Sequence, residues 1–220
     1  MFLTIIAQNT SPHTPTWGTG GTGGTGGTDG TGEEIPSVPQ VPLVPPVPYT
    51  RCMRILGIDP GLATVGIGII DAAGPQDLQV VDWLTITTKA GVPLPERLRE
   101  IGDDLASIIR NTAPHLAVVE RLFFATNEQT AIDVAQARGV ILRELAVAAV
   151  PILEPSPLQL KLAITGDGTA DKRQVQSMLP RLLELQEIPR PDDAADALAL
   201  AIYGALQHST LTAHRAARAF

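Results

Sequence analysis

The chain has 220 residues, with 16 Lys and Arg against 23 Asp and Glu, so its formal net charge at pH 7 is −7. The single cysteine excludes an intrachain disulfide framework and a cysteine-based zinc site, and this favours a cytoplasmic location. No apolar stretch approaches the roughly 20 residues that a membrane-spanning helix needs, so no membrane partner is predicted.

Residues 1–52 differ in composition from the rest of the chain. Gly-Thr-Gly repeats are followed there by a stretch rich in Pro and Val. Such a segment cannot bury enough apolar surface to offset the entropy of ordering it, so a disordered tail is predicted. Met53 could equally be an alternative translation start, and the tail would then not be translated. The remainder is interpreted as one domain over 53–208, followed by a flexible C-terminal tail over 209–220.

Three strands are predicted at the start of this domain. Apolar runs predict strands over 54–59 and 65–70, separated by a short turn, and a third strand over 78–87. Asp59 closes the first run and is followed directly by Pro and Gly, which turn the chain and leave the carboxylate at the exposed end of the strand.

Helices and strands alternate after the third strand, which predicts an α/β fold with a mixed sheet and helices on its faces. Apolar spacing, proline positions and candidate caps give the approximate limits of these elements. They are a helix over 94–110, a strand over 116–120, a helix over 127–149, a strand over 151–154, a helix opened by Ser156 and Pro157, and helices over about 170–186 and 193–207.

Four acidic residues stand where such a fold would expose them. Glu120 ends an apolar run as Asp59 does, and Asp193 and Asp196 lie three residues apart on one face of an alanine-rich helix. Four clustered carboxylates would repel one another without a cation, so they predict a metal-binding nuclease site. Alternatively, Asp59 caps a turn and Glu120 forms a surface ion pair. Asp193 and Asp196 would then interact favourably with the helix dipole. Asp192 could also exchange roles with its neighbour Asp193.

Four motifs follow one another along the domain. They are Ile-Leu-Gly-Ile-Asp-Pro-Gly at 55–61, Glu-Arg-Leu-Phe-Phe-Ala-Thr-Asn at 120–127, Gln-Ala-Arg-Gly at 136–139 and Asp-Ala-Ala-Asp-Ala-Leu at 193–198. In this order and at these separations they resemble the RuvC-type Holliday junction resolvases of the RNase H-like superfamily, and the similarity covers Met53 to about His208. It implies an RNase H-like fold with a mixed five-stranded sheet flanked by helices. It also implies a homodimeric, magnesium-dependent endonuclease that nicks two strands of a four-way DNA junction symmetrically in recombination and repair.

The resemblance implies a role for individual residues. The acidic tetrad would hold two Mg²⁺ ions, with Mn²⁺ able to substitute, and would consist of Asp59, Glu120, Asp193 and Asp196. Lys161 and Lys172 match basic residues that hold the scissile phosphate near the catalytic centre, and Phe123 matches an aromatic that stacks on unpaired bases. Weaker candidates for contacts to the DNA backbone are Arg121, Arg138 and Arg173. Ordinary solvated lysines and a core phenylalanine are the alternatives.

The helix predicted over 127–149 carries a flat face of small residues, Ala131, Ala135 and Gly139, at four-residue intervals. Two copies of the chain could approach closely there around a twofold axis, although a helix contact within one subunit explains the same face. A branch-migration helicase complex is a further partner implied by the resemblance.

Other functions have to explain the same residues. The acidic balance of the chain argues partly against nucleic-acid binding, so phosphate contacts would need a local basic patch and bound metal. One alternative is an RNase H-like nuclease that processes ribosomal RNA precursors. Another is phosphotransfer, because residues 57–61 are similar to the phosphate loop of actin-like sugar kinases. A third is a junction-binding protein without catalytic activity.

Overall fold

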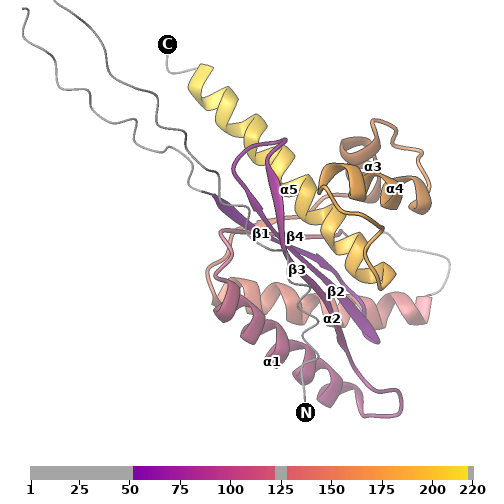
Figure 1. Ribbon diagram of the computed structural model, residues 1–220. Coiled ribbons are helices and arrows are strands. Elements are labelled where there is room, and N and C mark those ends of the chain that lie inside the picture. The colour runs from indigo at the N-terminus through magenta and orange to yellow at the C-terminus, as the bar shows by residue number, and fades with distance from the viewer. Residues whose placement is uncertain (1–51, 122–127, 218–220) are drawn as a thin grey trace, which may run out of the picture. The chain divides into compact units, whose positions relative to one another are not determined.

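The computed structural model describes residues 52–121 and 128–217 (Figure 1). Five strands form one sheet in the order β3-β2-β1-β4-β5, with β2 antiparallel to both β3 and β1, and β4 parallel to both β1 and β5. This confirms the predicted mixed five-stranded sheet. The elements are β1 (Met53–Asp59), β2 (Thr64–Ala72), β3 (Leu78–Thr87), α1 (Leu94–Thr112), β4 (Leu116–Val119), α2 (Glu128–Val147), β5 (Ile152–Leu153), α3 (Pro157–Thr165), α4 (Lys172–Leu182) and α5 (Asp192–Ala217).

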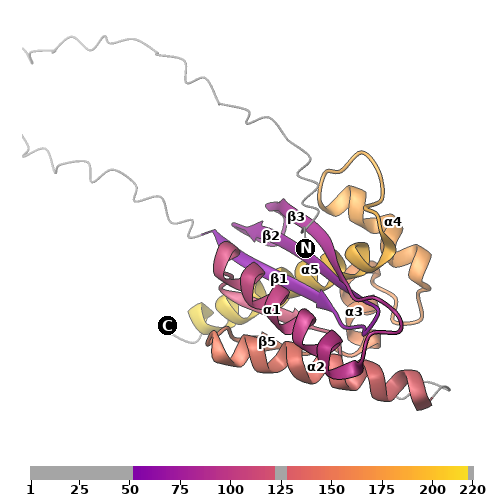
Figure 2. The same ribbon diagram turned by 90° about the horizontal axis from the view of Figure 1, so that it is seen from below.

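The sheet separates two hydrophobic cores, because successive side chains of a strand point to opposite faces. Leu56 and Ile58 of β1 contribute to the core that α1 and α2 cover. Ile55 of the same strand contributes to the other core, beneath α3, α4 and α5. Figure 1 and Figure 2 show these two layers of helices on opposite faces of the sheet.

Helix α5 lies unusually close to the sheet because glycines replace side chains beneath it. A Cβ added at Gly68 would lie 2.6 Å from the backbone N of Leu198, and one added at Gly57 would lie 2.6 Å from the backbone N of Ala201. At Gly66 a Cβ would collide with the carbonyl O of Asp193. These contacts place the first turns of α5, with their aspartates, directly over β1 and β2.

Some predicted limits need correction. Strand β5 has only two residues, and β4 ends at Val119, so Glu120 follows the strand and is not part of it. Helix α5 continues to Ala217, past its predicted end at about 207. No glycine or proline occurs between Gln207 and Ala217 to end the helix. In the part of the chain that the structure describes, no helix is long and apolar enough to cross a membrane.

Candidate metal-binding active site

Two carboxylates are brought together by the pairing of β1 with β4. These strands are adjacent and parallel, and Ile58 pairs with Val119. Asp59 and Glu120 are the next residues along each strand direction, so both emerge at the same edge of the sheet. Asp59 lies four residues after Ile55 in β1, so its side chain points to the same face of the sheet and therefore toward α5. Strand register alone thus places the first two acidic residues side by side.

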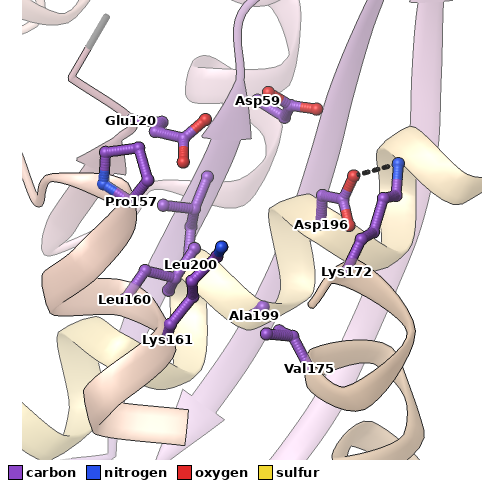
Figure 3. Close-up of a pocket in the computed structure, with 10 residues that line it drawn as sticks. All are labelled: Asp59, Glu120, Pro157, Leu160, Lys161, Lys172, Val175, Asp196, Ala199 and Leu200. Carbon is purple, nitrogen blue, oxygen red and sulfur yellow. Dashed lines mark ion pairs between the residues drawn. The ribbon is translucent and has the colours of Figure 1, made fainter. Parts of the chain in front are cut away.

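A third carboxylate, Asp196, comes from α5 and completes one wall of a cavity of about 160 Å³ (Figure 3). Two lysines from different helices also line it, Lys161 of α3 and Lys172 of α4. The cavity therefore combines three acidic and two basic side chains, from four elements of the fold and the residue that follows β4. Its remaining lining is apolar and consists of Pro157, Leu160, Val175, Ala199 and Leu200.

Helix α4 holds both carboxylate oxygens of Asp196. The Lys172 Nζ lies 2.7 Å from Oδ2, and the Gln176 Nε2 donates a hydrogen bond of 3.0 Å to Oδ1. Asp171 caps this helix reciprocally with Gln174, which fixes Lys172 in the first turn. The hydrogen bond that Lys172 donates to Asp196 raises the pKa of Lys172. Sequence reasoning missed Gln176, although its position one turn after Lys172 on the same helix face was a usable signal.

The cluster is short of positive charge. Burial, followed by the negative charges of Glu120, Asp196 and Asp193, raises the pKa of Asp59 to about 7, against the opposing effect of Lys172. Burial and Asp196 likewise raise the pKa of Glu120, while the two lysines oppose the shift. A bound divalent cation would relieve both the burial cost and the repulsion.

The donor set fits a hard cation such as Mg²⁺, which prefers carboxylate oxygens. Within residues 52–121 and 128–217, however, no three His, Cys, Asp or Glu side chains are already grouped closely enough to hold one ion. Mg²⁺ is usually bound by one or two carboxylates together with waters and substrate phosphates.

The two neighbouring aspartates at the start of α5 differ in their surroundings. Asp193 is half-buried and contributes to the raised pKa of Asp59, although it does not line the cavity. Asp192 is exposed and contributes instead to the raised pKa of Lys172. The structure therefore favours Asp193 over Asp192 as the inner residue of the pair.

Three of the four residues predicted to contact DNA are described by the structure, and they differ in how exposed they are. Phe123 lies outside the described residues. Arg121 and Arg173 are exposed, one after β4 and one in the first turn of α4. Arg138 of α2 has a side chain that is only 16% exposed, and its guanidinium is engaged by Glu120 and Glu154.

Comparison with known proteins identifies the family. The family model described as Crossover junction endodeoxyribonuclease RuvC matches residues 55–204. The RuvC of Brevibacillus brevis is 49% identical over 150 residues, which cover 68% of this chain and 90% of that protein. The chain belongs to the RuvC family. The RuvC of Chloroflexus aurantiacus is 51% identical over 159 residues, covering 72% of this chain and 96% of the relative.

Solved structures of RuvC proteins share the fold. Thermus thermophilus RuvC in complex with a Holliday junction substrate aligns with a TM-score of 0.69 and 32% identity, covering 73% of this chain and 97% of the other. The yeast mitochondrial resolvase Ydc2 aligns with a TM-score of 0.53 at 17% identity, covering 76% of this chain and 86% of the other, which shows similarity of fold alone. These matches confirm the RNase H-like fold and the resemblance drawn from the motifs.

Proposed function

We propose that the chain is a structure-selective endonuclease that resolves four-way DNA junctions by paired, symmetric nicks in homologous recombination and DNA repair. Membership of the RuvC family supports this, as does the Thermus thermophilus relative that was solved with a Holliday junction. The observation that carries the proposal is the cavity where Asp59, Glu120 and Asp196 meet Lys161 and Lys172. Metal-assisted hydrolysis of a phosphodiester uses this combination of ligands for a cation and donors for a phosphate.

Asp59, Glu120, Asp193 and Asp196 would hold Mg²⁺, most simply two ions, with Mn²⁺ as a substitute. Bound metal would supply an activated water at neutral pH and neutralise charge at the scissile phosphate. Lys161 lies within the cavity and would bind a non-bridging phosphate oxygen. In the structure Lys172 forms an ion pair with Asp196. With Asp196 bound to a cation, Lys172 would be available to bind the phosphate instead. The exposed Arg121 and Arg173 would bind the DNA backbone outside the cavity, and Phe123 would stack on unpaired bases.

A matched set of substrates tests the proposal. A four-way DNA junction, a linear DNA duplex and an RNA duplex of the same sequence are each incubated with the protein, in Mg²⁺ and in EDTA. The proposal predicts paired nicks in the four-way junction alone, and only with Mg²⁺. Preferential cleavage of the RNA would favour the RNA-processing alternative, whereas tight junction binding without nicking in any divalent metal would favour a junction-binding protein without catalytic activity.

We also propose that the protein acts as a homodimer through α2. Ala135 and Gly139 are exposed, and a Cβ added at Gly139 would meet nothing within 4 Å. Ile132 and Val147 of the same helix are 60% and 69% exposed, which is unusual for large apolar residues. Ala135 and Gly139 are exposed and Ala131 is half-buried, which supports a contact between two copies over a helix contact within one subunit.

Replacing Ala135 with Arg is predicted to give monomers that bind junctions but make single nicks. Sedimentation velocity measures the oligomeric state, and a supercoiled plasmid carrying a cruciform distinguishes paired from single nicks. An unchanged dimer would overturn the assignment of α2 as the interface. A branch-migration helicase remains a proposed partner on family membership alone, and co-purification with that assembly would test it.

A further inference from the structure

Arg138 joins the ends of two parallel strands next to the cavity. Its Nε donates a hydrogen bond of 3.0 Å to the main-chain O of Glu120, the residue that directly follows β4. Its Nη2 forms an ion pair with Glu154, the residue that directly follows β5. One guanidinium on α2 therefore binds the main chain of one strand end and the side chain of the next.

Glu120 lies beyond the last ladder pairs of β4. On the β5 side the ladder ends with Val118 paired to Leu153, and on the β1 side with Val119 paired to Ile58. Past them, the Arg121 N–H donates to the Pro155 O at 2.9 Å. This N–H belongs to the same peptide as the Glu120 carbonyl, so Pro155 and Arg138 hold the two sides of one peptide. The orientation of that peptide limits the directions in which the Glu120 side chain leaves the backbone.

The same contacts make Arg138 a poor candidate for a DNA contact. Its side chain is only 16% exposed, and two of its donors already have partners within the protein. The carboxylate of Glu154 also compensates its charge. A phosphate contact works through an available positive charge, which this arrangement does not offer.

We propose that Arg138 is a positioning residue for Glu120, which it holds by clamping the end of β4 to Glu154 at the end of β5. This inference rests on the proposed nuclease function. Without the clamp, this peptide would keep only its bond to the Pro155 O, so Glu120 would sample more orientations, and a cation and a phosphate would meet a correctly placed carboxylate less often. Partners that orient a metal ligand typically change metal affinity or activity by about 10–100-fold when they are removed.

Three variants separate positioning from DNA binding: Arg138→Gln, Arg138→Lys and Glu154→Gln. We would measure the junction Kd in EDTA, the single-turnover cleavage rate with all junction bound, and the Mg²⁺ concentration that gives half the maximal rate. Two controls accompany them. Arg121→Gln shows the effect of losing an exposed arginine near DNA, and Arg99→Gln removes an exposed ion pair with Asp103 on α1.

Positioning predicts that Arg138→Gln and Glu154→Gln both lower the single-turnover rate about 10–100-fold and raise the half-saturating Mg²⁺ concentration, with Kd unchanged within about twofold. Arg138→Lys is expected to rescue little, because one ammonium cannot reproduce the fork that reaches both partners. The Mg²⁺-induced rise in melting temperature of the DNA-free protein should also shrink in Arg138→Gln, and this readout does not depend on cleavage.

A DNA contact predicts the opposite pattern. Arg138→Gln would weaken junction binding, and it would lower the slope of log K against log salt concentration by about one. Arg138→Lys would restore binding, and Glu154→Gln would tighten it. That pattern overturns the inference, as does a normal rate in Glu154→Gln. If Arg138→Gln does not fold, the rate and Mg²⁺ dependence of Glu154→Gln decide. If the wild-type protein cuts no junction, the proposed function is refuted. The role of Arg138 is tested separately, by the ratio of the variant's cleavage rate to that of the wild type.

Discussion

Asp59→Asn is predicted to make the metal-free protein more stable at neutral and alkaline pH, although it should abolish cleavage. Asp59 is largely buried at the end of β1 and faces the negative charges of Glu120, Asp196 and Asp193. An ionised carboxylate in this place destabilises the folded state, and an amide of nearly the same shape removes the charge.

The magnitude follows from the pKa of Asp59, which is about 7 in the folded protein against an ordinary value of 3.8. At about 1.4 kcal/mol per pH unit this difference corresponds to about 4 kcal/mol. The folded state holds the proton more tightly, so the penalty is absent below about pH 4, grows as pH rises to about 7 and is constant above that. For a chain of this size, about 4 kcal/mol corresponds to about 8–16 °C in Tm.

The assay is urea unfolding of wild type and Asp59→Asn in EDTA at several pH values between 4 and 8. The variant should gain stability relative to wild type as pH rises, with the difference largest at pH 8. Mg²⁺ should reverse the order at pH 8, because only the wild type keeps the full ligand set. Asp103→Asn, on an exposed carboxylate of α1, is the matched control and should show no such trend. If the variant is no more stable than wild type at pH 8, the ionised Asp59 carboxylate does not destabilise the folded state.

Three other predictions follow from the same geometry. Gly68→Ala should lower the free energy of unfolding by about 1–3 kcal/mol or more, because its Cβ would lie 2.6 Å from the backbone N of Leu198, and urea unfolding measures this. Asp193→Asn should reduce both cleavage and Mg²⁺-induced stabilisation, whereas Asp192→Asn should stay near wild type in a Mg²⁺ titration; the reverse order would exchange their roles. Junction binding measured by fluorescence anisotropy should weaken steeply between low and physiological salt, because each phosphate contact releases counterions from the DNA, and a flat dependence would contradict this.

Much of the fold could be predicted because local signals and tertiary packing agree. The strand over 78–87 was predicted with the limits that the structure shows, and the proline pair at the start of α1 marked that helix correctly. Helix ends were less predictable. The end of α5 lies at Ala217 and not at 207, because the polar residues that follow Gln207 are compatible with a continuing helix.

The candidate site could be predicted in part from the sequence for the same reason. Two acidic residues at the ends of parallel strands must lie near each other once the strands are neighbours, so Asp59 and Glu120 could be paired from the sequence. The sequence does not contain the distance between α5 and the sheet, which depends on glycines in β1 and β2 facing alanines in α5. The partners of Arg138 were hidden as well, because they depend on where α2 lies against the ends of β4 and β5.

The central claim is that these carboxylates form a metal-dependent site for cutting four-way DNA junctions. The most direct measurement is cleavage of a synthetic four-way DNA junction by wild type and Asp59→Asn, in Mg²⁺ and in EDTA, with junction binding measured in parallel. We expect symmetric nicks by the wild type only when Mg²⁺ is present, and none by Asp59→Asn, which should still bind the junction. Equal nicking by both proteins, or nicking by the wild type that persists in EDTA, would contradict the claim.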